Sequence, residues 1–149
     1  MHFYLADTNA LVWFLTGSPR LRTGARRVLL NRNSHVLIAV ATFEDLRRKF
    51  QHQVGRGGPE LPPALVMLEV ARCAKNVCVY PCDSAVIAEM LRLEHSRTGF
   101  TDPEDLQILA TFLVLNRVLK RRGHAIAYVG SDSRIQNYFQ KRDLEVLPA

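Results

Sequence analysis

Cysteine is scarce in this sequence of 149 residues, which has only three, at positions 73, 78 and 82. An odd number excludes a fully paired disulfide framework. The cysteines also lack CxxC spacing and a nearby pair of histidines, so a zinc site would be missing a fourth ligand. We therefore expect reduced thiols that pack as small, buried hydrophobic side chains.

Long hydrophobic runs are absent, because no apolar stretch approaches the roughly 18 residues needed to span a membrane. The first residues lack the basic segment and the cleavage site of a secretory signal peptide. Together with the unpaired cysteines, these absences predict a protein without membrane segments, located in the cytoplasm.

Acidic residues are outnumbered, with 14 Asp and Glu against 20 Lys and Arg and a formal net charge of +6. The 48% hydrophobic content is ordinary for a folded protein, and the length suits one domain, which we assign to residues 1–149. The basic balance fits a polyanionic partner such as nucleic acid, or an acidic protein.

Five short, almost continuously apolar segments predict β-strands. They are Phe3–Ala6, Val36–Val40, Val77–Tyr80, Ala125–Val129 and Leu144–Leu147. Continuous apolar character is typical of strands that are covered on both faces of a parallel sheet.

Amphipathic segments between these strands predict helices. Their ranges are 8–16, 21–31, from about 42 onward, 62–75, from 83 or 84 onward, 103 to about 120, and 133–140. A Gly- and Pro-rich loop is expected at 55–63. Alternating strands and helices indicate an α/β fold with a mainly parallel sheet of about five short strands.

Acidic residues stand near the carboxyl ends of the predicted strands, the edge where open parallel sheets bind ligands. One follows the first strand and one the fourth, two lie in the helix after the second strand, and three open the long helix at 103. They are Asp7, Asp132, Glu44, Asp45, Asp102, Glu104 and Asp105. If the topology is parallel, these carboxylates converge at one edge of the sheet.

Carboxylates held close together repel one another, and burial raises their pKa. A hard divalent cation such as Mg²⁺ or Mn²⁺ relieves this repulsion. One or two such ions can activate a water molecule for attack on a phosphodiester. The alternative is that Asp7, Asp102 and Asp132 only cap helices, because each stands where a helix begins. The five histidines are scattered and form no acid–base pair.

Four segments, in order, resemble the conserved acidic segments of PIN domains, in particular the VapC-type toxin ribonucleases. They are "YLADTNALVWFL", "VLIAVATFEDLRRKF", "DPEDLQILATFLVL" and "YVGSDSRIQNY". The resemblance covers nearly the whole chain. It implies a three-layer α/β/α sandwich and a Mg²⁺-dependent endoribonuclease, with Mn²⁺ as a possible substitute.

The resemblance also assigns metal ligands. Asp7 matches the first acidic position, Asp105 the third (with Asp102 as a substitute) and Asp132 the fourth. For the second position the spacing favours Asp45, which precedes Leu46 as in the family pattern, and Glu44, which has the usual residue type, is the near equal. One residue on a helix rotates a side chain by about 100°, so the two cannot be equivalent.

Small polar and basic residues surround these acids. Thr8, Asn9 and Ser131 either bind a metal-bound water or a phosphate, or cap helices. Arg47 and Arg48 are candidates for binding RNA phosphates, with a solvated helix face as the alternative. Other basic residues gather at 20–32 and 120–122.

The partners implied by the resemblance are an RNA substrate, a second copy of the chain in a homodimer, and a VapB-like antitoxin protein. The alternative is a non-catalytic PIN-like module that binds RNA or protein, which the irregular second acidic segment favours. A phosphatase built on Asp7 is disfavoured because the second Asp of such motifs, two residues on, is here Asn9.

Overall fold

The five apolar segments form the expected sheet in the computed structural model, which describes residues 2–54 and 77–149. The strands are β1 (His2–Ala6), β2 (Ser34–Ala39), β3 (Val77–Tyr80), β4 (Ile126–Gly130) and β5 (Val146–Pro148). All pairs are parallel and the order is β3-β2-β1-β4-β5, so β1 is central. The predicted α/β fold with a parallel sheet is confirmed.

Helices connect the strands close to the predicted ranges. They are α1 (Thr8–Leu15), α2 (Thr23–Leu30), α3 (Val40–Val54), α5 (Ser84–His95), α6 (Pro103–Arg121) and α7 (Ser133–Gln140). Val40, predicted to end the second strand, instead begins α3. The predicted helix at 62–75, the predicted loop at 55–63 and Cys73 lie outside the described residues.

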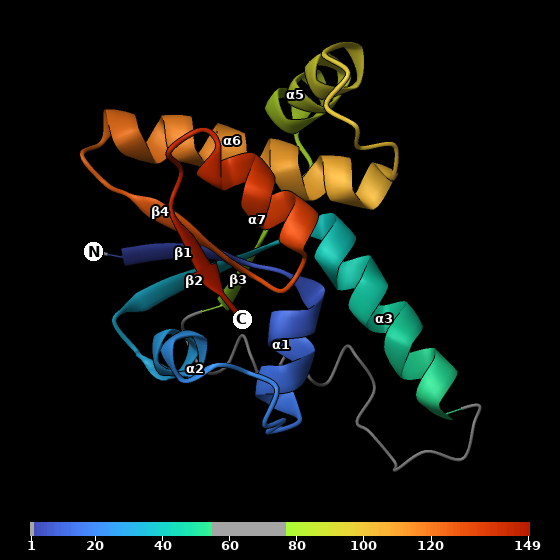
Figure 1. The fold of residues 1–149 in the computed structure, drawn as a ribbon, viewed down its shortest axis with the longest axis vertical. Helices are drawn as coiled ribbons and strands as arrows, with labels where there is room; N and C mark the ends of the chain where they lie inside the picture. Colours follow the sequence, from blue (N-terminus) through green and yellow to red (C-terminus); the bar gives the residue numbers. More distant parts are fainter. Residues whose placement is uncertain (1, 55–76) are drawn as a thin grey trace.

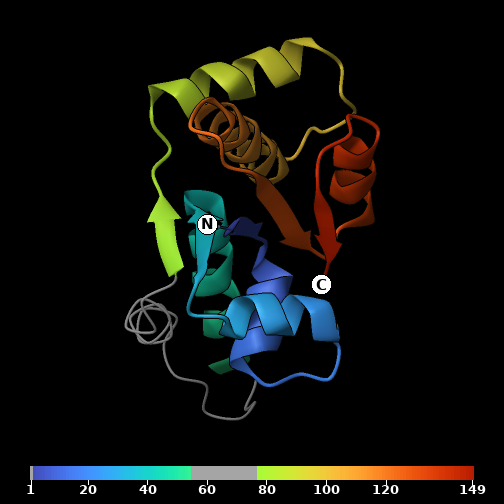
Figure 2. The same ribbon diagram turned by 90° about the vertical axis from the view of Figure 1, so that its left-hand side faces the viewer.

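The sheet lies between two layers of helices, as the α/β/α expectation requires (Figures 1 and 2). Successive side chains of a strand point to opposite faces. Leu5 therefore joins the core beneath α5, α6 and α7, while the next residue, Ala6, packs with Leu11 of α1 and Ala25 of α2. Both faces are apolar, which explains the unbroken hydrophobic character of the strands.

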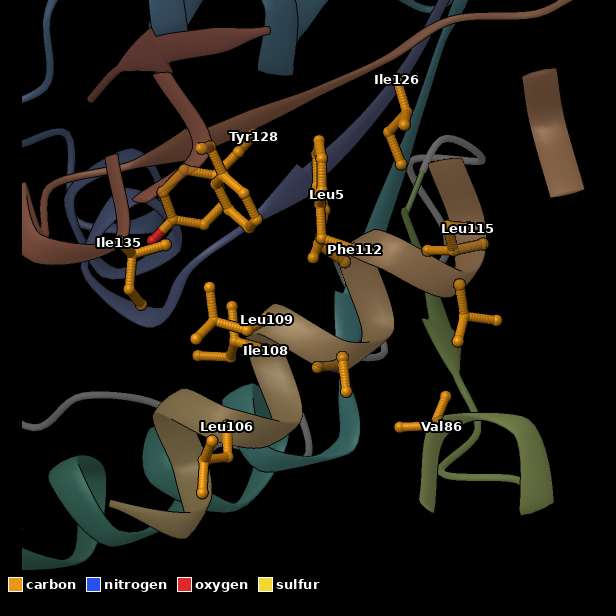
Figure 3. Packing of buried hydrophobic residues seen from close by; sticks show 14 of the residues in the cluster. Leu5, Val86, Leu106, Ile108, Leu109, Phe112, Leu115, Ile126, Tyr128 and Ile135 are labelled. Atoms are coloured by element: carbon orange, nitrogen blue, oxygen red, sulfur yellow. The ribbon is translucent and has the colours of Figure 1, made fainter. Parts of the chain in front are cut away.

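Helix α6 is the centre of the larger core. Its buried residues occur on most sides of the helix, as its continuous apolar sequence predicts. Figure 3 shows its side chains pointing toward Leu5 and Tyr128 of the sheet. Phe112 lies 4.3 Å from Phe139 of α7, measured between ring centroids, and meets Tyr128 edge-on. These aromatic contacts attach α6 and α7 to β4.

One expectation about the cysteines is wrong. Among the described strands, β3 is at the edge of the sheet, and Cys78 is exposed on it. Cys82, two residues after this strand, is partly buried. Both thiols are free. In the part of the chain that the structure describes, no helix is long and apolar enough to cross a membrane.

Replacing Phe112 with Ala tests the core under α6. The ring is fully buried, so Phe112→Ala is expected to lower the free energy of unfolding by about 3–5 kcal/mol through lost packing and a cavity. Val118→Ala on the same helix is the control; this side chain is exposed, and the expected change is within about 0.5 kcal/mol. Urea denaturation measures both, and equal losses would contradict this packing.

Candidate active site

Asp7 stands at the centre of the carboxyl edge of the sheet, directly after β1. Its backbone N–H donates to the carbonyl of Val129 in β4 at 2.9 Å. Its carboxylate accepts three hydrogen bonds: Oδ1 from the Ala10 N–H at 2.7 Å, and Oδ2 from the Ser131 N–H at 2.8 Å and the Tyr128 hydroxyl at 3.2 Å. The predicted helix cap is confirmed, because the Ala10 bond closes the first turn of α1.

The bond from Tyr128 depends on a glycine two residues further along β4. Residues i and i+2 of a strand lie on the same face, and a Cβ on Gly130 would lie only 2.3 Å from the Tyr128 hydroxyl oxygen. The absence of a side chain at position 130 thus lets the buried Tyr128 ring extend along the strand to Asp7.

Burial raises the pKa of Asp7, and its three hydrogen bonds and the nearby Lys49 ammonium oppose that rise without cancelling it. Burial, and then the negative charge of Asp7, raises the pKa of Tyr128 well above its ordinary value. The phenol therefore stays protonated and remains a hydrogen-bond donor to Asp7.

Asp105 and Asp132 lie together and share a cation. Nη2 of Arg134 donates to Asp105 Oδ2 at 2.9 Å and to Asp132 Oδ2 at 3.1 Å. Asp132 also caps α7, accepting from the Arg134 and Ile135 N–H groups. Partial burial raises the pKa of Asp132, but these hydrogen bonds outweigh it and the net shift is downward. For Asp105, burial outweighs Arg134 and raises the pKa.

Helix α3 separates the two candidates for the second acidic position. Asp45 points into the same cavity as Asp7 and lies 3.4 Å from the Lys49 ammonium. Glu44 is outside the described lining of that cavity, is half exposed, and pairs with Arg47 at 3.1 Å. Because one helical step turns the side chain by about 100°, only one of two neighbours faces the site.

The acidic cavity is the space these residues surround, with a volume of about 160 Å³. Five carboxylates from four parts of the chain line it: Asp7, Asp45, Glu104, Asp105 and Asp132. The convergence expected from the sequence is therefore present in the structure. It joins the residue after β1, the helix after β2, the start of α6 and the second residue after β4.

The expected supporting residues divide into two groups. Thr8 and Asn9 line the acidic cavity. Asn9 donates to Ser131 Oγ at 3.0 Å and accepts from Lys49 at 2.9 Å, so its amide links α1, α3 and the end of β4. Asp102 caps α6 by accepting from the Glu104 N–H at 2.8 Å and lies outside the described lining of the cavity.

The two arginines expected to bind RNA are engaged with acids. Arg48 pairs with Asp45 at 4.0 Å and with Glu104 at the rim of the acidic cavity. Arg47 pairs with Glu44 away from it. Both side chains are about half exposed, and their role in RNA binding stays a prediction.

The oxygen donors of the acidic cavity suit a hard divalent cation in their chemistry. Within residues 2–54 and 77–149, however, no three acidic, histidine or cysteine side chains are close enough to hold one ion together as they stand. Arg134 instead joins Asp105 and Asp132, and Lys49 accompanies Asp45. The cavity thus attracts positive charge, and Mg²⁺ or Mn²⁺ binding stays a prediction.

Sequence reasoning missed four residues of this site. Glu104 was noted among the acids but not selected. Lys49 is four residues from Asp45, a spacing that pairs side chains on a helix, and Arg134 is two residues from Asp132. Tyr128 reaches Asp7 only because β4 lies in register beside β1, with Leu5 opposite Tyr128. No local pattern indicates that register.

Comparison with solved structures shows the fold. A chain of VapBC2 from Rickettsia felis, solved bound to promoter DNA, matches with a TM-score of 0.61 and 13% identity, covering 99% of this chain and 98% of its own. A chain of DNA-bound VapBC from Salmonella typhimurium matches with a TM-score of 0.60 and 17% identity, and the match covers 99% of this chain and 98% of that one. A chain of FitAB bound to an IR36 DNA fragment matches with a TM-score of 0.54 and 18% identity, and the match covers 97% of this chain and 94% of that one. No protein-family profile and no curated protein sequence matches the chain. The chain therefore shares the fold of these VapBC and FitAB structures, and the expected α/β fold is confirmed.

Replacing Tyr128 with Phe tests the bond to Asp7. Losing this donor raises the pKa of Asp7 further. When the pKa of a carboxyl is higher in the folded than in the unfolded protein, the protonated form favours folding. Its contribution to stability is present at low pH and is lost as the pH rises through the pKa of the folded state. Tyr128→Phe should therefore cost about 1.5–3 kcal/mol at pH 7, as for a hydrogen bond to a charged group, and less near pH 3.

Urea denaturation at the two pH values measures this difference, and a carboxyl-carbon NMR titration reports the pKa of Asp7. Tyr80→Phe, on the edge strand β3, is the matched control and should show no such dependence on pH. A pH-independent loss in Tyr128→Phe would contradict the assigned bond.

Proposed function

We propose that this protein is a metal-dependent endoribonuclease of the PIN type and the toxin half of a VapBC-like toxin–antitoxin pair. One observation carries the proposal: four acidic segments, far apart in the sequence, contribute five carboxylates to one cavity at the carboxyl edge of the sheet. The fold shared with the VapBC and FitAB structures supports it.

In this proposal Asp7, Asp45, Asp105 and Asp132 hold Mg²⁺, for which Mn²⁺ can substitute. The bound ion supplies a water of lowered pKa and positive charge beside the phosphodiester. The carboxylates need no histidine as base, and Glu104 adds negative charge at the rim of the cavity.

The surrounding residues prepare this site. The hydrogen bonds from Ala10, Ser131 and Tyr128 fix the orientation of the Asp7 carboxylate. Each carboxylate oxygen accepts about two hydrogen bonds. Oδ2 is therefore filled, and Oδ1, which accepts only from Ala10 among the described residues, keeps one position for a ligand. Arg134 and Lys49 offset the repulsion among the acids until a divalent cation replaces them.

The proposed partners follow from the same assignment. A VapB-like antitoxin would neutralise the protein in the cytoplasm, and a second copy would form a homodimer. Ile87 and Leu91, one turn apart on α5, are exposed and supply an apolar surface for such contacts.

A second candidate is a non-catalytic PIN-like module that binds RNA or protein. The ion pairs of Arg134, Arg48 and Lys49 with the cavity acids favour it. In such a module these pairs would be permanent, and no divalent cation would compete for the carboxylates.

Asp105→Asn separates these candidates with little risk to the fold, because the amide oxygen can still accept from Arg134. The rate of Mg²⁺-dependent cleavage of single-stranded RNA should fall about 100-fold or more. Mutating even a residue that only hydrogen-bonds to a metal ligand lowers activity or metal affinity about 10–100-fold. Glu94→Gln makes the same charge change at an exposed position of α5 and should leave cleavage unchanged. If wild type does not cleave, or if Asp105→Asn cleaves like wild type, the nuclease proposal fails.

The adjacent pair on α3 tests which acid serves the site. Asp45→Asn should lower the cleavage rate at least about tenfold, which is the lower limit of the loss of activity usually seen when residues around a bound metal are mutated. Glu44→Gln should lower it less than twofold because Glu44 points away from the acidic cavity. Single-turnover cleavage at saturating Mg²⁺ measures both. The reverse order would assign Glu44, and two equally small losses would favour the non-catalytic module.

A further inference from the structure

A second, larger cavity lies between α7 and the segment that joins α5 to α6. Its volume is about 560 Å³, and we call it the basic cavity. Five cationic side chains line it: Arg92, Arg97, Arg134, Lys141 and Arg142. None of its lining residues in the described part of the chain is acidic. This concentration of positive charge requires an explanation, because like charges repel.

Three of these cations keep their charge available for a ligand. Within residues 2–54 and 77–149, Arg97, Lys141 and Arg142 form no ion pair with an acid. Arg142 is held over the Tyr138 ring, 3.7 Å from its centroid, and donates to the Tyr138 carbonyl at 3.2 Å. Its guanidinium is therefore positioned without being neutralised.

Arg92 differs from these three because it pairs with Glu89, whose side chain is buried and also accepts from Arg117 at 2.7 Å. The Arg92–Glu89 pair lies within α5, and the Arg117–Glu89 pair joins α5 to α6. Arg92 is thus held in place by Glu89, and the other cations keep the net charge of the basic cavity positive.

An aromatic ring lies among these charges. Phe100 is partly exposed and meets Tyr138 edge-on, with 5.7 Å between ring centroids. The Arg134 guanidinium lies 5.8 Å from its centroid. Basic side chains combined with a ring that can stack on a base are the features that bind single-stranded nucleic acid.

The basic cavity adjoins the acidic cavity through one residue. Arg134 lines the basic cavity, and its Nη2 reaches Asp105 at 2.9 Å and Asp132 at 3.1 Å. Both aspartates line the acidic cavity. A strand that lies in the basic cavity therefore has the acidic cavity next to it.

We propose that the basic cavity binds the part of a single-stranded RNA that flanks the bond cut in the acidic cavity. This inference rests on the proposed nuclease function. Arg97, Lys141 and Arg142 contact backbone phosphates, and Phe100 stacks on a base. An acidic peptide would satisfy the cations, but the ring between them matches the alternation of phosphate and base along a nucleic acid strand.

Binding of a fluorescently labelled, ten-nucleotide single-stranded RNA in EDTA tests the cations without cleavage. In fluorescence anisotropy, Arg97→Gln/Lys141→Gln should weaken binding about tenfold at low salt. The slope of log K against log salt should shrink by about 1.4, because each phosphate contact with a single strand contributes roughly 0.7.

The matched control is Arg27→Gln/Arg32→Gln, which removes the same charge from α2 and the turn after it, in the helix layer on the other face of the sheet. It should weaken binding less than twofold and leave the slope unchanged. Equal losses in the two double variants would show that only overall charge matters and would overturn the inference.

Phe100→Leu tests the stacking contact. It should weaken binding of the RNA about tenfold, within the range measured for one stacked base. Binding of a strand of the same length that lacks bases should not change. An equal loss with both strands would mean that the ring only supports the fold, and would overturn the stacking assignment.

Two further outcomes separate the inference from the function on which it rests. If polyglutamate binds the wild type and loses affinity in Arg97→Gln/Lys141→Gln, while RNA binding does not, the basic cavity is a protein-binding site and the inference fails. If Mg²⁺-dependent cleavage is intact but RNA affinity is insensitive to this pair, the inference fails alone. If RNA binds in the basic cavity and no Mg²⁺-dependent cleavage occurs, the nuclease proposal fails and the basic cavity is the RNA-binding site of a non-catalytic module.

Discussion

The buried carboxylate of Asp7 is the contact on which the carboxyl edge of the sheet depends. Its hydrogen bonds join the end of β1 to the first turn of α1, to Tyr128 in β4 and to the backbone after β4. A buried carboxylate is costly unless donors surround it. The three donors offset that cost, and they also fix Asp7 in the orientation that the proposed metal site requires.

Charge organises the surface beyond Asp7. Five carboxylates line the acidic cavity, while the charged residues that line the basic cavity beside it, in the described part of the chain, are all cations. Arg134 belongs to both, because it lines the basic cavity and pairs with Asp105 and Asp132. A phosphodiester strand needs both signs of charge nearby: cations for its backbone and, in the proposed mechanism, acids that hold the catalytic ion.

The fold could be predicted closely because its elements depend on local patterns. The apolar run at Val77–Tyr80 is a strand at those residues, and Asp102-Pro103 begins the long helix as its capping chemistry predicts. Val40 was misassigned because a β-branched residue at a strand end looks like strand from its neighbours alone. The exposure of Cys78 was missed because the strand order, which places β3 at an edge, is not a local property.

The sequence by itself determined which segments are strands and helices, and that acidic residues follow β1 and β4 and occupy α3 and the start of α6. Local periodicity and capping depend on residues a few positions apart, which the sequence displays directly. Only the tertiary structure decided that Asp45 rather than Glu44 faces the acidic cavity. It also decided that Tyr128 donates to Asp7 across 121 positions of sequence. Such contacts follow from strand register and helix rotation, which are set by packing of the whole chain.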